Sequence, residues 1–378
     1  MVLTYILAFF TVVSLVLTIW QWLVATNFPL GQRITQPSFT PSISILKPLK
    51  GSDARTAECL RTWCNQDYAA PVQVLFGVAS ASDRVCDIVR EMIAAHPHLD
   101  AQLVVCPENH GSNAKVSTLI QLQSAATHEI LLVSDADVYA PPDLLKQVVQ
   151  PLSDSAVGLV TCFYRLINMS NLGMRWEAFA INADFWSQVL QAQSLRPIDF
   201  AMGAVMVTRK AELNAIGGFS SLADYLADDY QLGNKIARSG KRVVISPVVV
   251  ECRSATLQWK EVWSHQTRWA RTIRVSQPIP YFFSKLSNGT FWPFLWAVCD
   301  PGPRSYFFGA FCVLVRMAQA CYCEGKLTGR RRLSSLWLAP IKDLLQLAIW
   351  VLAFTGNRIQ WRGREFQVQP NGKLVPLN

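Results

Sequence analysis

The chain has 378 residues, of which 51% are hydrophobic and only 16% charged, and its formal net charge is +9. This composition is too apolar for an ordinary soluble enzyme and too charged for an all-helical transporter, so we expect a soluble domain carried on a few membrane segments. From Lys260 onward, 16 Lys and Arg stand against 5 Asp and Glu. Because these basic residues flank apolar segments, anionic lipid headgroups explain them better than nucleic acid, and we expect no nucleic-acid partner.

The first segment, residues 2–25, contains no charged side chain. As a helix it would be about 36 Å long, which is enough to cross the hydrocarbon of a bilayer. It lacks the basic start and the small-residue cleavage site of a signal peptide, so we predict a retained transmembrane anchor over residues 1–26. Arg33, Lys47 and Lys50 follow it, which predicts that the next part of the chain is cytoplasmic.

Strand-like and helix-like segments alternate after a Pro- and Ser-containing linker at 36–41. We expect strands at 43–46, 72–78, 103–106, 130–133, 157–164, 202–207 and 243–246. Helices are expected between them, including 176–190 and one that residues 225–230 open and that runs to about 239. This alternation predicts an α/β fold with a parallel sheet and helices on both faces.

The predicted strand at 130–133 is followed by Asp135-Ala136-Asp137. Open α/β sheets bind their ligands at the carboxyl ends of strands. Residues two apart in a strand point to the same side, so the two carboxylates can share one ligand. Paired hard oxygens without a nearby His or Cys suit Mg²⁺ or Mn²⁺ carrying a phosphate. The alternative is a solvated turn with two capping Asp residues, because the motif is short and common.

Further charged residues fall at strand ends or helix starts: Lys47, Lys50, Asp83, Lys115, Asp228 and Asp229. Acids for a metal together with lysines for phosphates favour a nucleotide-sugar site. The sequence has neither a P-loop motif nor a Gly-x-Ser-x-Gly elbow, which excludes those two mechanisms. Lys47 and Lys50 are equally compatible with solvated loop charges, and Asp83 with a helix cap.

The order of these motifs along residues 43–274 resembles the ceramide glucosyltransferase family (glycosyltransferase family 21), including the related hopanoid-lipid glycosyltransferase branch. The resemblance implies a GT-A fold with a mixed, mainly parallel sheet and helices on both faces. It also implies an inverting glycosyltransferase with a UDP-sugar donor and a membrane lipid acceptor. The carriers are Lys47-Pro48-Leu49-Lys50-Gly51, Asp83, Asn113-Ala114-Lys115, Asp135-Ala136-Asp137, Asp228-Asp229-Tyr230 and Arg268-Trp269.

The resemblance also implies roles for the donor-side residues. Lys50 and Asp83 would lie near the uridine, and Lys115 would bind the donor. Asp135 would contact the ribose and diphosphate, and Asp137 would ligate the metal with it. The first acidic motif departs from the family, because Ser80 and Ser82 stand where relatives can carry acids.

On the acceptor side, the resemblance makes Asp229 the catalytic base and lets Arg268 and Trp269 close over the pyrophosphate and acceptor. The chain departs from the family at His265, which stands where relatives have Gln or Arg; an imidazole can still donate a hydrogen bond. Adjacent residues at a helix start point about 100° apart. We therefore expect Asp229 to face the cleft and Asp228 to cap the helix.

The predicted organisation is an anchor at 1–26, a cytoplasmic GT-A domain at 42–275, transmembrane or interfacial helices within 290–356 and a cytoplasmic tail at 357–378. The apolar segments 306–323 and 336–354 carry Arg316 and Lys342-Asp343, so the sequence leaves the number of spans open. We expect an integral protein of a bacterial inner membrane, with Arg330, Arg331 and Arg332 facing the cytoplasm.

Four other functions remain as alternatives. A hopanoid-lipid N-acetylglucosaminyltransferase is not separable by motif. A polysaccharide synthase needs more spanning segments than the three or so available. A non-enzymatic membrane scaffold is disfavoured by the intact Asp135, Asp137, Asp229 and Arg268. A nucleotidyltransferase would leave Arg268-Trp269 unexplained.

Overall fold

The computed structural model describes residues 1–331, 333–361 and 364–377, which divide into two units. The helical unit comprises residues 1–28, 169–196 and 257–363, and the sheet unit comprises residues 29–168, 197–256 and 364–378. Residues 169–196 and 257–275, which we placed in the predicted domain 42–275, group with the helical unit.

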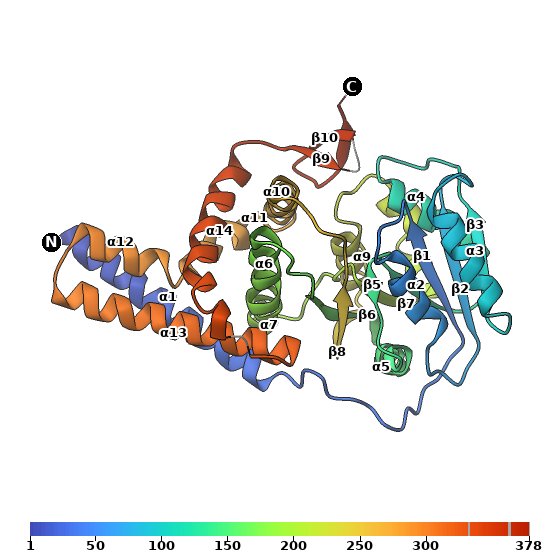
Figure 1. Ribbon diagram of the computed structural model, residues 1–378, viewed down its shortest axis with the longest axis horizontal. Coiled ribbons are helices and arrows are strands. Elements are labelled where there is room, and N and C mark those ends of the chain that lie inside the picture. Colours follow the sequence, from blue (N-terminus) through green and yellow to red (C-terminus); the bar gives the residue numbers. More distant parts are fainter. Residues whose placement is uncertain (332, 362–363, 378) are drawn as a thin grey trace. The chain divides into compact units, whose positions relative to one another are not determined.

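The sheet unit is built on eight strands in the order β3-β2-β1-β4-β7-β6-β8-β5 (Figure 1). Strands β3, β2, β1 and β4 pair in parallel with one another, and β6 pairs in parallel with β8. Strand β7 is antiparallel to both β4 and β6, and β5 is antiparallel to β8. The mixed, mainly parallel sheet is thereby confirmed. The strands are β1 (Ile43–Leu49), β2 (Val72–Val78), β3 (Asp100–Val105), β4 (Ile130–Ser134), β5 (Val138–Tyr139), β6 (Val157–Leu166), β7 (Val205–Arg209) and β8 (Arg242–Cys252).

Helices follow the first three strands and cover both faces of the sheet (Figure 1). Parallel crossovers are right-handed, so α2 and α3 cover one face while α4, whose connection runs back to β4, covers the other. The helices of this unit are α2 (Thr56–Cys64), α3 (Val85–Ala95), α4 (Ala114–Ala125), α5 (Leu144–Val149), α8 (Lys210–Ala215) and α9 (Asp228–Arg238), with 3-10 turns at Gln150–Ser153 and Phe219–Leu222.

The central strands β1 and β4 are buried along their whole length. Strands covered on both faces are near-continuous apolar runs, which is why the sequence pattern identifies them. Each fully buried Val, Leu or Ile stabilises the fold by about 1.5–3 kcal/mol. Two polar residues interrupt this core at the carboxyl end, Lys47 and Ser134, and both are fully buried.

The helical unit contains the predicted anchor as α1 (Val2–Asn27) and two predicted apolar segments as α13 (Pro303–Thr328) and α14 (Leu338–Phe354). The helix predicted at 176–190 is interrupted by a π-helical turn at Ala180–Phe185, between α6 (Leu172–Phe179) and α7 (Trp186–Gln193). The other elements are α10 (Trp259–Ser276), α11 (Pro278–Phe283), a 3-10 turn at Ser284–Ser287, α12 (Phe291–Cys299), a second 3-10 turn at Leu333–Ser335 and β9 (Arg358–Trp361).

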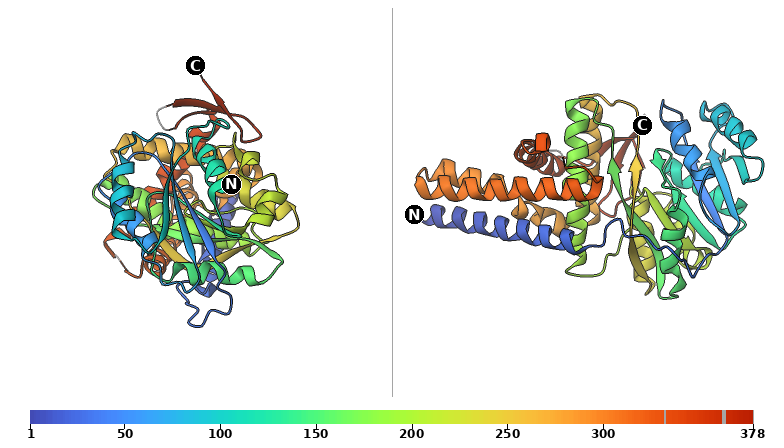
Figure 2. Two further views of the ribbon diagram at one scale, coloured as in Figure 1. Left: turned by 90° about the vertical axis from the view of Figure 1, so that its right-hand side faces the viewer. Right: turned by 60° about the horizontal axis from the view of Figure 1, so that its bottom comes forward.

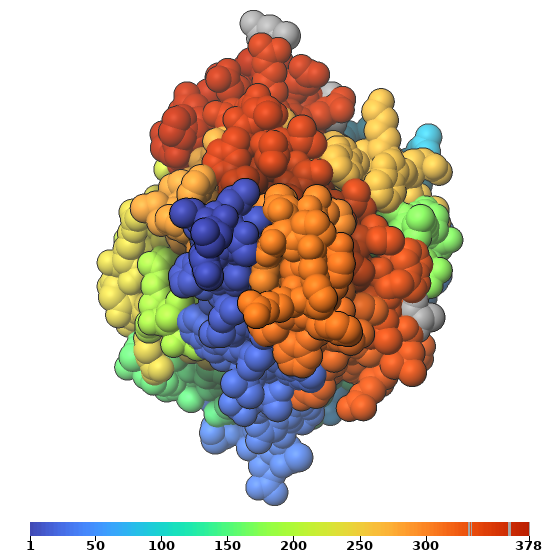
Figure 3. Space-filling view, turned by 90° about the vertical axis from the view of Figure 1, so that its left-hand side faces the viewer, coloured from blue at the N-terminus to red at the C-terminus, as the bar shows by residue number. Residues whose placement is uncertain are grey.

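Among the described residues, α1 and α13 are the two helices long and apolar enough to cross a membrane. They lie side by side (Figures 2 and 3), and exposed apolar side chains such as Phe9 and Leu314 run along them. The ammonium of Lys326 donates to the carbonyls of Ala25, Thr26 and Phe28 at 2.8, 2.7 and 2.9 Å. This contact joins the carboxyl ends of the two helices, which are therefore parallel.

The charges inside the apolar segments pair with one another. Arg316 of α13 lies 2.7 Å from the carboxylate of Asp184 and 2.9 Å from that of Asp343 in α14. Lys342 lies 2.8 Å from Asp343 and also pairs with Asp184. All four side chains are buried. Such pairing is how ionisable residues are accommodated within apolar helix bundles.

The predicted tail contains a hairpin that belongs to the sheet unit. Strand β10 (Arg364–Val368) pairs with β11 (Leu374–Pro376) in antiparallel register. No repeating pattern in the sequence predicted these strands.

Candidate active site

Lys115 connects two acidic segments of the sheet unit. Asn113 caps α4 by accepting hydrogen bonds from the backbone of Lys115 and Val116, at 3.0 and 3.2 Å. This cap places Lys115 in the first helical turn, where its Nζ lies 2.8 Å from Asp135 Oδ1 and 3.0 Å from Asp228 Oδ2. Burial alone would lower the pKa of Lys115, but the two carboxylates outweigh it and raise that pKa. Lys115 is therefore a permanent cation at this site.

Asp135 and Asp137 lie on a turn between β4 and β5. Val138 donates its backbone N–H to the Asp135 carbonyl at 3.4 Å, so the residues do not continue the strand as we expected. The turn is fastened by the indole of Trp63, which donates to the Val138 carbonyl at 2.9 Å. Burial, and then the charge of Asp135, raise the pKa of Asp137 to about 6. The charge of Asp135 thus acts on Asp137 although the two residues are not on one strand.

Lys47 supports this turn from within the core. Its Nζ donates to Ser134 Oγ at 3.2 Å and to the Asp135 carbonyl, and it lies 4.5 Å from the centroid of the Trp63 ring. Burial lowers the pKa of Lys47 to about 8, against the attraction of Asp135 and Asp137. Lys47 is therefore not a solvated loop charge.

Asp228 does not cap α9, and this prediction was wrong. The N-cap residue is Ala227, and no side chain makes a capping hydrogen bond. The Asp228 carboxylate instead pairs with Lys115. The physical reason is that Asp228 is buried, and a buried charge is held where a countercharge is available.

Asp229 and Asp135 line a common space beside Gly203. A Cβ atom at Gly203 would lie 3.0 Å from Asp229 Oδ2 and 3.6 Å from Asp135 Oδ2. The other Asp229 oxygen accepts from the Tyr230 backbone at 2.8 Å. Burial, and then the charge of Asp228, raise the pKa of Asp229 to about 6. Gly203 lies at the start of the strand predicted at 202–207. Nothing in the sequence indicated that this glycine faces two carboxylates.

The carboxylates of the Asp135–Asp137 turn fit a divalent cation that arrives with a phosphate. Within the described part of the chain, no three His, Cys, Asp or Glu residues are grouped to hold a metal. Mg²⁺ usually takes only one or two carboxylates and completes its shell with water and substrate phosphates. Asp135 and Asp137 supply carboxylates of that kind.

Lys50 and Asp83 follow the adjacent strands β1 and β2. The backbone N–H of Gly51 donates to both Asp83 oxygens, at 3.0 and 2.9 Å, and Val85 donates to Oδ1 at 3.0 Å. Asp83 thus supports the start of α3 and also ties the two loops together. Gly51 has a positive φ of 68°, which glycine adopts without strain. The Lys50 side chain is exposed.

His265, Arg268 and Trp269 lie on α10, in the helical unit, and so in a different unit from the carboxylates. Within that unit, His265 Nδ1 lies 2.6 Å from Glu177 Oε1 of α6, and its ring contacts Trp269 at a centroid distance of 4.6 Å. Gln266 donates to the same Glu177 oxygen at 3.0 Å. Sequence reasoning missed Glu177, because it is a single acid within an apolar aromatic helix.

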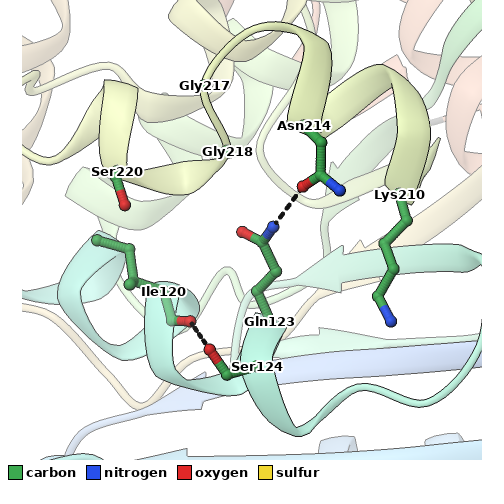
Figure 4. Close-up of a pocket in the computed structure, with 8 residues that line it drawn as sticks. All are labelled: Ile120, Gln123, Ser124, Lys210, Asn214, Gly217, Gly218 and Ser220. Carbon is green, nitrogen blue, oxygen red and sulfur yellow. Dashed lines mark hydrogen bonds between the residues drawn. The ribbon is translucent and has the colours of Figure 1, made fainter.

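A separate cavity of about 330 Å³ is lined by residues of α4, of α8 and of the turn that follows α8 (Figure 4). Lys210 donates its backbone N–H to the Glu129 carbonyl, just before β4 begins, so the cavity is at the amino end of that strand. It contains none of the predicted site residues. Its lining consists of Ile120, Gln123, Ser124, Lys210, Asn214, Gly217, Gly218 and Ser220.

Comparison with known sequences gives a match along nearly the whole chain. The model of the family described as Glycosyl transferase family 21 matches residues 4–374. The chain is 22% identical over 370 residues to Ceramide glucosyltransferase 3 of Caenorhabditis elegans, covering 93% of this chain and 78% of that protein. It is 23% identical over 247 residues to an N-acetylglucosaminyltransferase of Mesorhizobium japonicum, covering 61% of this chain and 56% of that protein.

Among solved structures, the chain is similar to the mannosyltransferase PcManGT from Pyrobaculum calidifontis, determined in complex with GDP-Man and Mn²⁺. The TM-score is 0.58 at 20% sequence identity, and the match covers 93% of this chain and 98% of that one. This likeness, together with the strand order, confirms the GT-A fold.

Proposed function

Because the chain belongs to glycosyl transferase family 21, we propose that it transfers a hexose from a UDP-sugar to the hydroxyl of a membrane lipid, with inversion, as a ceramide glucosyltransferase does. The observation that carries the proposal is the arrangement around Lys115. One fixed cation holds Asp135 and Asp228, while Asp229 and Asp135 face a common space at Gly203.

The donor would lie along the carboxyl ends of β1, β2 and β4. Lys50 and Asp83 would contact the uridine, and Lys115 and Asp135 the diphosphate side. Mg²⁺ or Mn²⁺ held by Asp135 and Asp137 would neutralise charge on the departing diphosphate. Lys47 keeps the Asp135–Asp137 turn in place through its bonds to Ser134 and the Asp135 carbonyl.

Asp229 would be the catalytic base. Its Oδ2 would accept the proton of the acceptor hydroxyl while that oxygen bonds to the anomeric carbon and the bond from that carbon to the diphosphate oxygen breaks. One displacement inverts the configuration, and UDP leaves with the electron pair of the broken bond. A pKa near 6 leaves Asp229 ionised at neutral pH but more basic than an ordinary carboxylate.

By the family resemblance, Arg268 and Trp269 would contact the pyrophosphate and the acceptor, and His265 precedes them on the same helix. Glu177 accepts from the His265 ring, so it would act as a positioning residue that fixes the imidazole orientation.

The lipid acceptor accounts for the apolar helices. We propose that α1 and α13 span a bacterial inner membrane and that the sheet unit is cytoplasmic. Arg330 and Arg331 follow α13, whose end adjoins the end of α1 through Lys326. Each such residue near anionic headgroups contributes about 1 kcal/mol. Arg332 lies outside the described residues.

An Arg331→Cys variant, made with Cys299 replaced by serine, should react only with reagent from the cytoplasmic side; labelling from the outer side alone would contradict this orientation.

The test is a product assay with the purified full chain in lipid nanodiscs. UDP-glucose and ceramide should yield a hexosylated lipid by mass spectrometry, and Asp229→Asn should yield little. The Mesorhizobium relative, an N-acetylglucosaminyltransferase, favours UDP-N-acetylglucosamine as a second donor to test. Hopanoid alcohols are tested as a second acceptor, because the resemblance includes the hopanoid-lipid branch. Failure of every donor and acceptor pair would contradict the proposed function.

A further inference from the structure

The C-terminal hairpin of β10 and β11 is packed through buried side chains and also contacts the loop before α9. Val368 pairs with Leu374 across the β10–β11 ladder, and Phe366, Val368 and Leu374 are all buried, with at most 4% of each exposed. Residues two apart in a strand share a face, so Phe366 and Val368 form one apolar face with Leu374 opposite Val368. The hairpin therefore has a buried apolar face.

Beyond this ladder, residues Gly372, Lys373 and Leu374, here called the C-terminal strap, pair with the loop that precedes α9. Tyr225 and Lys373 form an antiparallel bridge. Leu374 donates its backbone N–H to the Asp224 carbonyl at 2.7 Å, and Leu226 donates to the Gly372 carbonyl at 3.3 Å. Gly372 has a φ of +85°, and a Cβ there would lie 3.6 Å from the Tyr225 ring.

The Tyr225 side chain adds two weaker contacts. The ammonium groups of Lys373 and Lys235 lie 5.8 and 5.9 Å from the centre of its ring. Cations within about 6 Å of an aromatic face are attracted to it. The strap is thus joined to the loop by backbone hydrogen bonds and by a side-chain contact.

The same loop is held on its other side by the residues before α4. Asn113 donates its backbone N–H to the Ala223 carbonyl and its side-chain amide to the Tyr225 carbonyl, each at 2.8 Å. Ser112 donates to the Asp224 carboxylate at 3.0 Å. The loop therefore lies between the start of α4, which carries Lys115, and the strap. Asp228 and Asp229 follow directly after it.

We propose that the C-terminal strap is a positioning element of the active site, which fixes the loop before α9 and so sets the direction of Asp229. The part of this inference that concerns catalysis rests on Asp229 being the base. Without the strap, the loop keeps its bonds to Ser112 and Asn113 but loses those on the opposite side. A displacement of about 1 Å in a catalytic group can lower a rate about 100-fold.

The test compares two substitutions at one position in the full chain. Leu374→Pro removes the side chain and also the N–H that bonds to Asp224, whereas Leu374→Ala removes the side chain alone. Both should lower the melting temperature, and Leu374→Pro should lower it further because it also loses the hydrogen bond to Asp224. Leu374→Pro should in addition lower kcat by about 10- to 100-fold, with the donor KM little changed, because the groups proposed to bind the donor lie outside the loop. Val375→Ala, at an exposed neighbouring position, should behave as the wild type.

A covalent rescue separates positioning from general damage. Tyr225 and Lys373 face each other as a non-hydrogen-bonded pair, a geometry with Cα atoms about 4.5 Å apart that admits a disulfide. Tyr225→Cys with Lys373→Cys, added to Leu374→Pro, should restore most of kcat under oxidising conditions and lose it again on reduction. The parent Leu374→Pro variant should not respond to the oxidant.

Hydrogen exchange at the Leu226 amide measures whether the hydrogen bond from Leu226 to the Gly372 carbonyl of the strap is present, and it requires no substrate. Protection there should fall in Leu374→Pro and remain in Leu374→Ala, and it is measurable even if no sugar donor is accepted. An inactive wild type with a protected Leu226 amide would contradict the proposed function and leave the strap in place. Equal kcat in the two Leu374 variants, or an unchanged Leu226 amide in Leu374→Pro, would overturn the inference about the strap.

Discussion

Lys115 Nζ lies 3.0 Å from Asp228 Oδ2, which joins the first turn of α4 to the first turn of α9. Both side chains are about nine-tenths buried, at 9% and 10% exposure. Solvent screens such a pair far less than a surface pair, and removing one partner leaves the other charge uncompensated. The pair therefore contributes to the position of α9 as well as to the charge of the site.

Lys115→Met should destabilise the protein by about 3–5 kcal/mol, the usual effect of breaking a buried ion pair from one side. Adding Asp228→Asn should recover part of that loss, since the second change removes one of the stranded charges. Chemical denaturation of the two single variants and the double variant measures the coupling. If the two effects simply add, Lys115 and Asp228 do not act as a pair.

Turnover should depend on a divalent cation. Asp137→Asn should lower metal-supported turnover strongly with little change in the melting temperature, because the residue lies on a turn and not in the apolar core. Asp154→Asn, at an exposed carboxylate that pairs with Arg242, serves as the matched control. Activity assays with EDTA and then with added Mg²⁺ or Mn²⁺ check this prediction. Undiminished activity in EDTA is incompatible with it.

The two acids at the start of α9 should differ in their effect on catalysis. Asp229→Asn should lower kcat by about 10²–10⁴-fold, the usual contribution of a general base, with donor affinity nearly unchanged. Asp228→Asn should lower kcat less and stability more, since it breaks the bond to Lys115. Steady-state kinetics together with donor binding by calorimetry separate the two. If Asp228→Asn loses more kcat than Asp229→Asn, Asp228 and not Asp229 is the catalytic base.

The raised pKa of Asp229 gives two pH effects of opposite direction. A base must be deprotonated, so kcat/KM should rise with pH through the region near 6 and then level off, and Asp229→Asn should lose this rise. In the metal-free protein the folded state binds the Asp229 proton more tightly than the unfolded state. Its contribution to stability is therefore present at low pH and is lost as the pH rises from about 4 to about 6. Asp229→Asn should accordingly melt at a higher temperature than the wild type at pH 7.

The parts of the fold that sequence reasoning found are those specified by local pattern. Strands β1 and β4 are largely apolar and buried along their whole length because both of their faces are covered. Parallel strands bring their carboxyl ends to one edge, which is why Lys47, Asp83 and Asp135 were predicted to lie near one another from chain order alone.

The parts that sequence reasoning missed depend on partners far away in the chain. The helix start suggested a cap at Asp228, but Lys115 provides a buried countercharge that no local pattern reveals. The two residues of β5, which were not predicted as a strand, pair with the end of β8. Likewise, the C-terminal strap forms an isolated antiparallel bridge with Tyr225, whose own segment shows no strand pattern.

Gly203 provides the most sensitive test of the site geometry. A methyl group added there would lie 3.0 Å from Asp229 Oδ2 and 3.6 Å from Asp135 Oδ2, so one or both carboxylates must move or the space between them must shrink. Gly203→Ala should therefore lower kcat by at least about tenfold, since catalytic groups tolerate little displacement. The melting temperature should change little, because the added methyl meets side-chain oxygens and not the backbone.

Gly302→Ala is the matched control: a Cβ there meets no atom within 4 Å and the φ of −178° suits any residue. Kinetics and thermal unfolding of both variants measure the difference. Wild-type turnover by Gly203→Ala would mean that the reacting groups do not meet beside Gly203.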